Sequence, residues 1–363
     1  MSKRERSVKQ ASGPYITQKD VALRAGVSSS IVSYVINNGP RSISEETRQR
    51  VLRAIEELDY RPNVHAQKLK LASWENELAP RNFGVVFGGS RDVLLRPFYL
   101  SITYSILDEA VHKALNMRFM LFYEDLSNAQ LFNKLIHPEE ISAVLLLKPG
   151  PKLWSEDGVS LLARIRARIP NIVSVGRQTP GIPSVTFDVS QAIYQAAHHI
   201  LELGHRQIAY IGTTETRIAG FKRALADFEI PYNPTLVIPH EVYNTVESGY
   251  TAAQTLLASG ALQGPARVTA IVIASDEVAW GVMRCLKEAG LRIPEDVSLI
   301  CIDDDAYNTY LVPALTTVKI PKDQIGRLAL QLMLNRKGHL HEPPETTLLP
   351  TELIIRESCA PRS

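Results

Sequence analysis

The sequence has few cysteines, no long apolar run and no apolar leader. Among its 363 residues are 3 cysteines, Cys285, Cys301 and Cys359, which lack the spacing of paired metal ligands and indicate a reducing cytoplasm. No stretch approaches the roughly 18 apolar residues of a membrane span. The charged residues 1–6 are not followed by an apolar segment, so we expect neither a secretory signal nor a membrane partner.

Signatures of catalysis are also missing. The sequence contains no Gly-x-Ser-x-Gly motif, no glycine-rich phosphate loop and no histidine pair at metal-ligand spacing. The run Asp303-Asp304-Asp305 follows an apolar stretch and could attract Mg²⁺, but a solvated loop or a contact with a polar ligand is the simpler interpretation. We therefore expect no enzyme, no cofactor and no metal.

Charge is distributed unevenly along the chain. The net charge is +2, yet residues 1–74 hold 13 Lys and Arg against 7 Asp and Glu, whereas the remainder holds 27 against 31. A basic head on a mildly acidic body suggests that only the head meets a polyanion. The length of 363 residues predicts two or three globular domains.

The head contains a helix-turn-helix pattern over residues 17–37. Thr17 is suited to cap a first helix, Gly26 to form the turn, and Ser28 to cap a second helix whose apolar side points inward. The outer side of this second helix keeps hydroxyl, phenol and amide groups, which can bond to base edges and phosphates in a DNA major groove. The alternative is a small helical bundle that binds nothing.

Two further segments complete the head. Ser44 begins a third helix with a buried apolar stripe. Pro62 ends that helix, and residues 63–70 follow as a helix too short to be stable alone in water. We expect this short helix to order only against DNA or against a second copy of itself.

Residues 15–72 resemble the DNA-binding head and hinge of the LacI/GalR family of bacterial transcription regulators. The resemblance rests on motifs at the family's spacing, which include Asp20-Val21-Ala22, Ala25-Gly26-Val27-Ser28, Val35-Ile36-Asn37, Tyr60-Arg61-Pro62-Asn63 and Ala66-Gln67-Lys68-Leu69. It divides the head into a disordered basic tail over 1–14, a helix-turn-helix domain over 15–61, and a hinge helix with linker over 62–74. It also implies that Leu69 inserts as a wedge into the minor groove. The residues expected to contact DNA are Thr17, Ser28, Ser29, Ser30, Ser33, Tyr34, Asn37, Asn63, Leu69 and Lys70.

In the body, apolar strand-like runs alternate with amphipathic segments. This alternation predicts parallel sheets covered by helices, and the number of runs suits two lobes. Ligands of such sheets bind beyond the carboxyl ends of the strands, which here means a cleft between the lobes. The expected strands are 83–87, 119–123, 143–147, 172–175, 207–211, 270–274 and 298–302.

The body, residues 75–363, resembles the same family through segments such as Leu203-Gly204-His205-Arg206, Ser275-Asp276-Glu277 and Pro313-Ala314-Leu315-Thr316-Thr317. The resemblance implies a fold similar to periplasmic sugar-binding proteins. Lobe 1 would comprise about 82–187 and 318–350, and lobe 2 about 188–317 and 351–359, with crossovers near Phe187, Thr317 and Pro350. The implied effector-binding residues are Phe98, Tyr99, Arg177, Arg217, Tyr243, Asn244, Ser275 and Asp303.

An aromatic face, arginines and an aspartate are the groups that a sugar-like molecule needs. The alternative is that Arg217 and Asp303 only pair with each other. Two residues depart from the family pattern, because Ser275 replaces an Asn common in sugar-binding members and Cys301 replaces a common Gly.

The sequence thus predicts an α plus α/β chain, with a three-helix helix-turn-helix head, a hinge helix and a two-lobed periplasmic-binding-protein-like body. We expect a cytoplasmic, homodimeric transcription regulator, a repressor, bound to a near-palindromic double-stranded operator. A tetramer stays open. The expected effector is a small molecule, a sugar first and a nucleoside-like compound second. The rivals are a solute-binding protein of a transporter and, more weakly, a doubly wound α/β enzyme.

Overall fold

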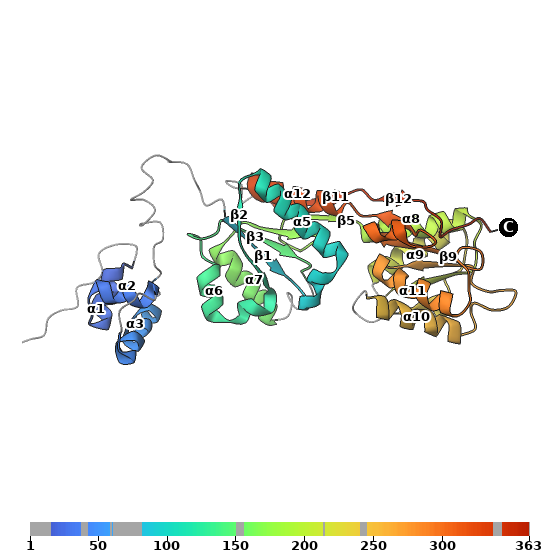
Figure 1. Ribbon diagram of the computed structural model, residues 1–363. Coiled ribbons are helices and arrows are strands. Elements are labelled where there is room, and N and C mark those ends of the chain that lie inside the picture. Colours follow the sequence, from blue (N-terminus) through green and yellow to red (C-terminus); the bar gives the residue numbers. More distant parts are fainter. Residues whose placement is uncertain are drawn as a thin grey trace, which may run out of the picture. The chain divides into compact units, whose positions relative to one another are not determined.

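A computed structural model defines residues 16–37, 43–58, 60, 82–149, 156–212, 215–239, 245–336 and 343–362. The chain divides into two units, Met1–Leu78 and Ala79–Ser363, which we call the head and the body (Figure 1).

The head packs three helices around a small apolar core. The helices are α1 (Gln18–Ala25), α2 (Ser29–Asn37) and α3 (Glu45–Glu57). Gly26 ends α1 with a φ of 66°, a left-handed conformation that glycine adopts at low steric cost, so the chain turns at once toward α2. The buried residues come from all three helices and from the segment after α3, and they are Val21, Ala22, Ala25, Val32, Val35, Val51, Ala54 and Tyr60.

The body contains two six-stranded sheets, which define its two lobes. The strand order is β11-β5-β4-β3-β1-β2 in lobe 1 and β12-β10-β9-β8-β6-β7 in lobe 2. Neighbouring strands are parallel, except that β12 runs antiparallel to β10. The two-lobed α/β prediction is therefore confirmed. The strands are β1 (Asn82–Phe87), β2 (Asn116–Phe122), β3 (Ala143–Leu147), β4 (Ile172–Val175), β5 (Ser184–Phe187), β6 (Ile208–Ile211), β7 (Val237–Ile238), β8 (Ala270–Ile273), β9 (Ser298–Asp303), β10 (Thr316–Lys319), β11 (Thr346–Leu349) and β12 (Glu352–Ile354).

Helices cover both faces of each sheet. In lobe 1, α5 (Pro97–His112) and α12 (Lys322–Asn335) lie on one face, and α6 (Ala129–Leu135) and α7 (Glu156–Arg168) on the other. In lobe 2, α8 and α9 share one face, and α10 and α11 the other. The lobe 2 helices are α8 (Val189–Glu202), α9 (Glu215–Asp227), α10 (Val246–Ala258) and α11 (Asp276–Glu288), and the short 3₁₀ helices of the body are η1 (Arg91–Leu95), η2 (Tyr123–Ser127), η4 (Pro234–Leu236) and η5 (Ala306–Tyr310).

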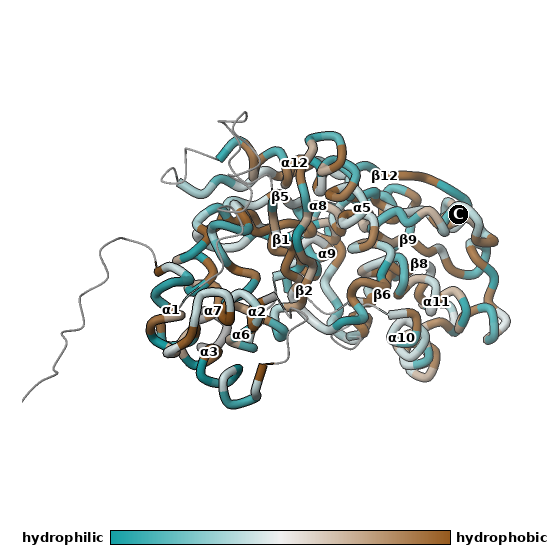
Figure 2. The backbone as a smooth tube through the Cα atoms, turned by 60° about the vertical axis from the view of Figure 1, so that its left-hand side comes forward, coloured by the Kyte–Doolittle hydropathy of each residue, from teal (hydrophilic) through white to brown (hydrophobic). Residues whose placement is uncertain are grey.

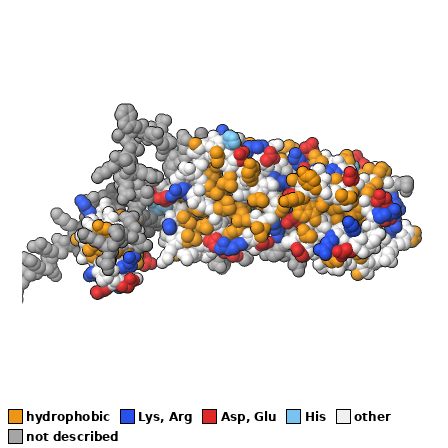
Figure 3. Space-filling view, viewed as in Figure 1, with side chains coloured by type: hydrophobic (Ala, Val, Ile, Leu, Met, Phe, Trp, Pro, Cys, Tyr) orange, Lys and Arg blue, Asp and Glu red, His pale blue; other side chains and the backbone are white. Residues whose placement is uncertain are grey.

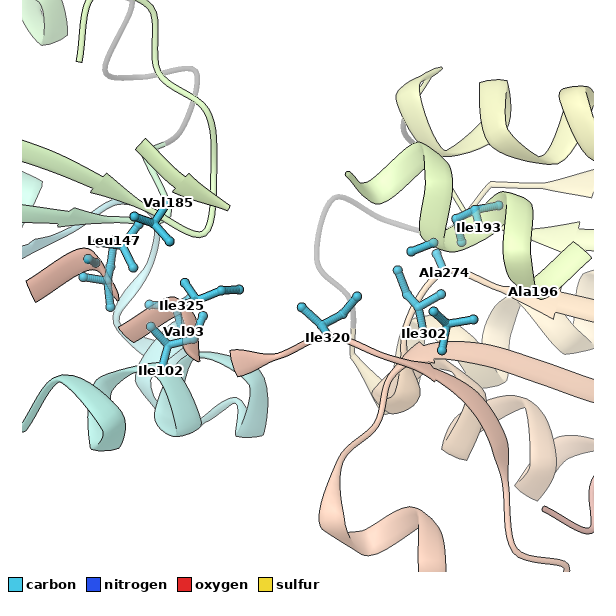
Figure 4. Packing of buried hydrophobic residues seen from close by; sticks show 14 of the residues in the cluster. Val93, Ile102, Leu147, Val185, Ile193, Ala196, Ala274, Ile302, Ile320 and Ile325 are labelled. Atoms are coloured by element: carbon cyan, nitrogen blue, oxygen red, sulfur yellow. The ribbon is translucent and has the colours of Figure 1, made fainter. Parts of the chain in front are cut away.

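Burial explains why the strands form where they do. Successive residues of a strand point to opposite faces, and both faces of these sheets are covered, so the central strands β3 and β8 consist of apolar residues only; Figure 2 colours the backbone by hydropathy. All five residues of β3 and all four of β8 are buried. The apolar core continues between the lobes, where Figure 4 shows Ile320, 1% exposed, on a connecting segment.

Glycines allow the helices of lobe 2 to cross closely. A Cβ on Gly281 of α11 would lie 1.9 Å from the carbonyl oxygen of Val246 in α10. A Cβ on Gly249 of α10 would lie 2.0 Å from the carbonyl oxygen of Val278 in α11. Each helix therefore has a glycine where the partner's backbone touches it.

The chain passes between the sheets three times. It leaves lobe 1 after β5, which ends at Phe187, and returns between β10 and α12. The third passage lies between β11 and β12, at Pro350 and Thr351. The second passage follows Lys319, the last residue of β10 that pairs with β9 of lobe 2, two residues beyond the crossover expected near Thr317.

Candidate DNA-binding helix and effector site

The second helix of the head presents a polar side away from the core. Val32 and Val35 of α2 are buried against α1 and α3, whereas Ser30 is exposed. At 3.6 residues per turn, Ser30, Ser33, Tyr34 and Asn37 fall on the side of α2 away from these valines, and Ser29 flanks it. Ser29, Ser33 and Tyr34 are partly exposed, and the side chain of Asn37 lies outside the described residues. The helix thus presents hydroxyls and a phenol as one surface.

Two other predicted DNA contacts lie at the starts of helices. The exposed Ser28 side chain accepts a hydrogen bond from the Ile31 N–H at 3.4 Å, at the beginning of α2. The exposed Thr17 precedes α1 and forms a capping box with Asp20, and its hydroxyl also donates to the Asp20 carboxylate at 2.6 Å. The same carboxylate accepts the Thr17 N–H at 2.7 Å, and these bonds lower the pKa of Asp20.

Several predicted contacts cannot be placed. Asn63, Leu69 and Lys70 of the expected hinge, and Tyr243 and Asn244 of the expected effector site, lie outside the described residues. They stay predictions.

In the body, the predicted aromatic pair begins helix α5. Pro97 occupies the first turn, where its missing N–H costs nothing, and Phe98 and Tyr99 follow. The two rings meet edge to face with centroids 5.1 Å apart. Phe98 also lies 6.1 Å from the ring of Phe187, at the end of β5 and the first passage between lobes.

The predicted polar residues lie at the carboxyl ends of strands or just beyond them. Arg177 follows β4 through Gly176, whose φ is 76°. Asp303 is the last residue of β9. Ser275 lies between β8 and α11, and Arg217 lies in the first turns of α9, which follows β6. Because parallel strands end at a common edge, these side chains share one end of each sheet.

The charged residues of this group act on the Tyr99 phenol. Burial raises the pKa of the Tyr99 phenol to about 12, while the charges of Arg217, Arg96 and Arg177 lower it and that of Asp303 raises it. We call Phe98, Tyr99, Arg177, Arg217 and Asp303 the carboxyl-edge cluster; the two rings are in contact, the three charged residues act on the Tyr99 phenol, and Arg177 itself is exposed.

The alternative interpretation of Arg217 and Asp303 can be tested against their contacts. Both are described, and they form no direct ion pair. The Nε atom of Arg217 is buried without a hydrogen-bond partner, as is the Ser275 hydroxyl, whose residue is 2% exposed. Burial raises the pKa of the Asp303 carboxyl above its usual range, with a further contribution from Asp276. The charges of Lys322 and Arg217 lower the pKa of Asp303, so Arg217 acts on this carboxyl without forming an ion pair with it.

Three charged residues near this cluster were not predicted from the sequence. Lys148 directly follows β3, and its Nζ lies 5.4 Å from the centroid of the Tyr99 ring. Arg96 immediately precedes α5 and is 7% exposed. Glu277 lies in the first turn of α11, and burial raises its pKa to about 7. The position of Lys148, one residue beyond a buried strand, is a signal that could have identified it.

Asp276 has a structural role beside the cluster. It is 2% exposed, and its carboxylate accepts hydrogen bonds from the Cys301 thiol at 2.9 Å and the Thr317 hydroxyl at 3.2 Å. The backbone N–H of Asp305 also donates to it. These bonds fix the loop after β9, and with it Asp303.

One surface pocket of the described residues lies elsewhere. It measures about 330 Å³, is open to solvent, and is lined by Asp188, Gln191, Gln195, Leu348, Leu349, Pro350 and Thr351. The Asp188 carboxylate already caps α8 by accepting the Gln191 N–H at 3.0 Å. This pocket therefore lacks the convergent charged groups of the carboxyl-edge cluster, and we give it no role.

Within the described ranges, no group of three or more His, Cys, Asp or Glu is placed to hold a metal ion. In the same ranges, no helix combines the length and apolar character needed to cross a bilayer.

Comparisons with known proteins identify the family. Residues 17–63 match the model of the bacterial regulatory proteins of the lacI family, and residues 197–359 match a periplasmic binding protein-like domain. The chain is 30% identical over 352 residues to the HTH-type transcriptional repressor PurR of Escherichia coli O139:H28, which covers 95% of this chain and 97% of that repressor. The chain belongs to the lacI family.

Solved structures of lacI-family regulators have the same fold. The transcriptional regulator CelR in complex with cellobiose is 26% identical, with a TM-score of 0.66 over 94% of this chain and 99% of that one. A lacI-family regulator from Enterococcus faecium with bound ribose is 25% identical, with a TM-score of 0.64 over 78% of this chain and 100% of that one. The recognition of a lacI-family DNA-binding transcription regulator is thus confirmed.

Proposed function

We propose that this chain is a cytoplasmic repressor that binds a near-palindromic operator as a homodimer and is controlled by a small molecule at the carboxyl-edge cluster. The proposal rests on two features of the same chain. Helix α2 has a polar outer side, and the body buries two polar atoms without hydrogen-bond partners, Arg217 Nε and Ser275 Oγ. The first suits base edges and phosphates, and the second suits a ligand.

The proposed effector is a sugar-like molecule. The rings of Phe98 and Tyr99 can pack on C–H groups, the Asp303 carboxylate can accept hydroxyl bonds, and the arginines can donate. The two similar regulators solved with cellobiose and ribose support this class. Ligand binding between the lobes would change their angle and thereby the DNA affinity of the dimer.

An exposed apolar stripe on α5 supports the homodimer. Leu100, Tyr104, Leu107 and Val111 recur at helical spacing, and Tyr104 is 69% and Val111 78% exposed. Figure 3 shows hydrophobic side chains gathered in broad groups on the viewed face of the body. Surfaces of this kind mark interaction sites. We propose a second copy as the occupant, because two heads held by two-fold symmetry would match a near-palindromic operator.

Operator binding is the first test. Gel-shift titration with the promoter region upstream of the protein's own gene should show a sequence-specific complex at moderate salt and with competitor DNA. Ser30→Ala should weaken that complex about 5- to 20-fold, the usual effect of one lost base-edge contact, whereas Gln49→Ala on the exposed side of α3 should not. Absence of any sequence-specific shift would favour the rival function, a solute-binding protein.

The dimer has its own test. Sedimentation of the wild type should give the mass of two chains. Tyr104→Glu should give monomers and weaker operator binding, whereas Thr251→Glu, at an exposed position of α10, should leave the dimer intact. A monomeric wild type, or a dimeric Tyr104→Glu protein, would contradict the role of α5.

A further inference from the structure

The first residue of α12 links the two lobes. Lys322 begins this helix of lobe 1 and is 8% exposed. Its ammonium group donates hydrogen bonds to the carbonyl oxygens of Asp303 at 2.5 Å and Asp304 at 2.9 Å, at the end of β9 in lobe 2. The Asp303 oxygen also accepts the N–H of Ile320, on the connecting segment, at 3.4 Å. A lysine of one lobe therefore holds the backbone of the other.

A lysine at the start of a helix is unfavourable for the helix itself. The first turn carries partial positive charge, so a cation there is repelled, and an ammonium group removed from water needs compensating acceptors. The two carbonyl oxygens are such acceptors. The charge of Lys322 also opposes the effect of burial on the pKa of the Asp303 carboxyl. The loop after β9, and not α12, therefore explains why a buried lysine occupies this position.

The loop that Lys322 holds has an unusual backbone. Asp303 has a φ of 123° and Asp304 a φ of 55°, in the region that favours glycine, and residues with a Cβ are strained there. Strained residues persist only where their surroundings fix them. The contacts from lobe 2 include those of Asp276 and that of Arg356, whose Nη2 lies 2.7 Å from the Asp304 carboxylate. The carbonyl groups of the two strained residues, in contrast, are held from lobe 1.

Helix α12 connects this contact to the rest of lobe 1. It packs closely on α5, because a Cβ on Gly326 would lie 1.9 Å from the Ser105 hydroxyl oxygen. Figure 4 shows Ile320 between the two lobes, on the segment that leads from β10 to α12. A shift of lobe 1 that moves α12 relative to lobe 2 therefore also moves the Lys322 ammonium group relative to the strained loop.

We propose that Lys322 is an interlobe strut, which holds the loop after β9 in a conformation that lobe 2 alone does not keep and so sets the position of the Asp303 carboxylate. When lobe 1 moves away, the two hydrogen bonds break, the backbone at Asp303 relaxes, and the carboxylate turns away from the carboxyl-edge cluster. The orientation of a polar group in lobe 2 thus depends on a helix of lobe 1. The inference rests on the proposed effector site for the role of Asp303, but the strut itself belongs to the ligand-free protein.

Hydrogen exchange in the ligand-free, full-length protein tests the strut. Lys322→Met keeps a long side chain and removes the ammonium group, whereas Lys319→Met changes an exposed lysine at the end of β10 and is the matched control. We expect the Asp305 N–H to exchange about tenfold faster in Lys322→Met than in wild type, because hydrogen bonds to a charged group are lost, and to be unaffected in Lys319→Met. The amides of β8, in the core of lobe 2, should exchange at the wild-type rate in both variants.

Two results would overturn the strut. One is unchanged exchange of the Asp305 N–H in folded Lys322→Met protein. The other is an equal acceleration at β8, which would show a general loss of stability instead of a local release. Lys322→Gln is measured in the same way if the Met variant does not fold.

Substitutions at Asp303 separate backbone strain from charge. In the Lys322→Met protein, Asp303→Gly should slow the exchange of the Asp305 N–H again, at least about fivefold, because glycine adopts a φ of 123° at low cost. Asp303→Asn removes the same charge but keeps the Cβ, so exchange should stay fast. Equal rates in the two double variants would refute the strain. These measurements need neither ligand nor operator, so their failure leaves the repressor proposal standing, and a failed gel shift leaves the strut standing.

Discussion

The Ser275 hydroxyl tests whether the effector site lowers the stability of the free protein in order to bind a ligand. Ser275→Ala removes a buried hydroxyl that has no partner and leaves a hydrogen atom in its place. An unsatisfied buried hydroxyl costs about 1–3 kcal/mol. A serine that caps a helix contributes about 0.5–2 kcal/mol, but the Ser275 side chain makes no cap bond, so this contribution is not lost. We therefore expect the variant to be more stable by about 1 kcal/mol.

A second serine provides the matched control. Ser358 is also buried in lobe 2, but its hydroxyl donates to the Leu299 carbonyl at 2.7 Å and accepts the Thr316 N–H at 2.8 Å. Ser358→Ala leaves that N–H unsatisfied and should destabilise the body by about 2–3 kcal/mol. The same substitution is thus expected to raise the stability at Ser275 and to lower it at Ser358, although both serines are buried.

Thermal unfolding of the full-length protein checks both variants. For a unit of this size, 1 kcal/mol moves the midpoint by roughly 2–4 °C. The melting temperature should rise for Ser275→Ala and fall for Ser358→Ala, and the increase caused by a bound effector should be smaller in Ser275→Ala than in wild type. A lower midpoint for Ser275→Ala would refute the reasoning, because it would mean that the hydroxyl is satisfied in the free protein.

Three further predictions follow from other contacts. Gly281→Ala should destabilise the body by about 1–3 kcal/mol, because the new Cβ would lie 1.9 Å from the Val246 carbonyl; an unchanged melting temperature would show that α10 and α11 can move apart. Glu277→Gln should unfold at a higher temperature than wild type at pH 8 and at nearly the same temperature at pH 4.5. The pKa of Glu277 in the folded protein, about 7, exceeds the ordinary glutamate value of 4.5, so wild type loses stability from this group as the pH rises between these values, by about 1–2 kcal/mol after allowance for partial exposure. An equal difference in melting temperature between the variant and wild type at both pH values would contradict the raised pKa of Glu277. Arg356→Met should lower the free energy of unfolding in denaturant by about 2–3 kcal/mol. The arginine lies 2.7 Å from the Asp304 carboxylate and donates to the Leu315 carbonyl, and the variant leaves both groups without this partner. The double variant Arg356→Met with Asp304→Asn should lose less stability than the sum of the two single variants.

Part of this fold follows directly from the sequence. The buried central strands β3 and β4 were predicted with the bounds that the structure gives, because strands covered on both faces are continuous apolar runs. Strands β5, β10 and β11 were not predicted. They contain Ser and Thr, and β11 is a partly exposed edge strand, so their sequences show neither a run nor a clear alternation. Strand β11 pairs with β5 across a long sequence separation, and local patterns do not encode such a pairing.

The site shows a similar division. Arg177 and Asp303 were predicted from the family resemblance, and the structure places Arg177 just after β4 and Asp303 at the end of β9, at the carboxyl ends of parallel strands. Arg96 and Glu277 were missed because each belongs to the start of a helix, where a charged residue usually serves the helix itself. The sequence does not encode how the lobes pack, so it could not show that Arg96 and Glu277 lie near the carboxyl-edge cluster.

The interleaving of the lobes has a consequence for biosynthesis. Translation delivers the chain from its N-terminus, and domains generally fold as they emerge. The head is complete early, but each sheet waits for an edge strand near the C-terminus, β11 for lobe 1 and β12 for lobe 2. A nascent chain on the ribosome therefore has its DNA-binding helices long before it has a body able to respond to a ligand. A product terminated before Thr346 would keep the head and leave both sheets unfinished.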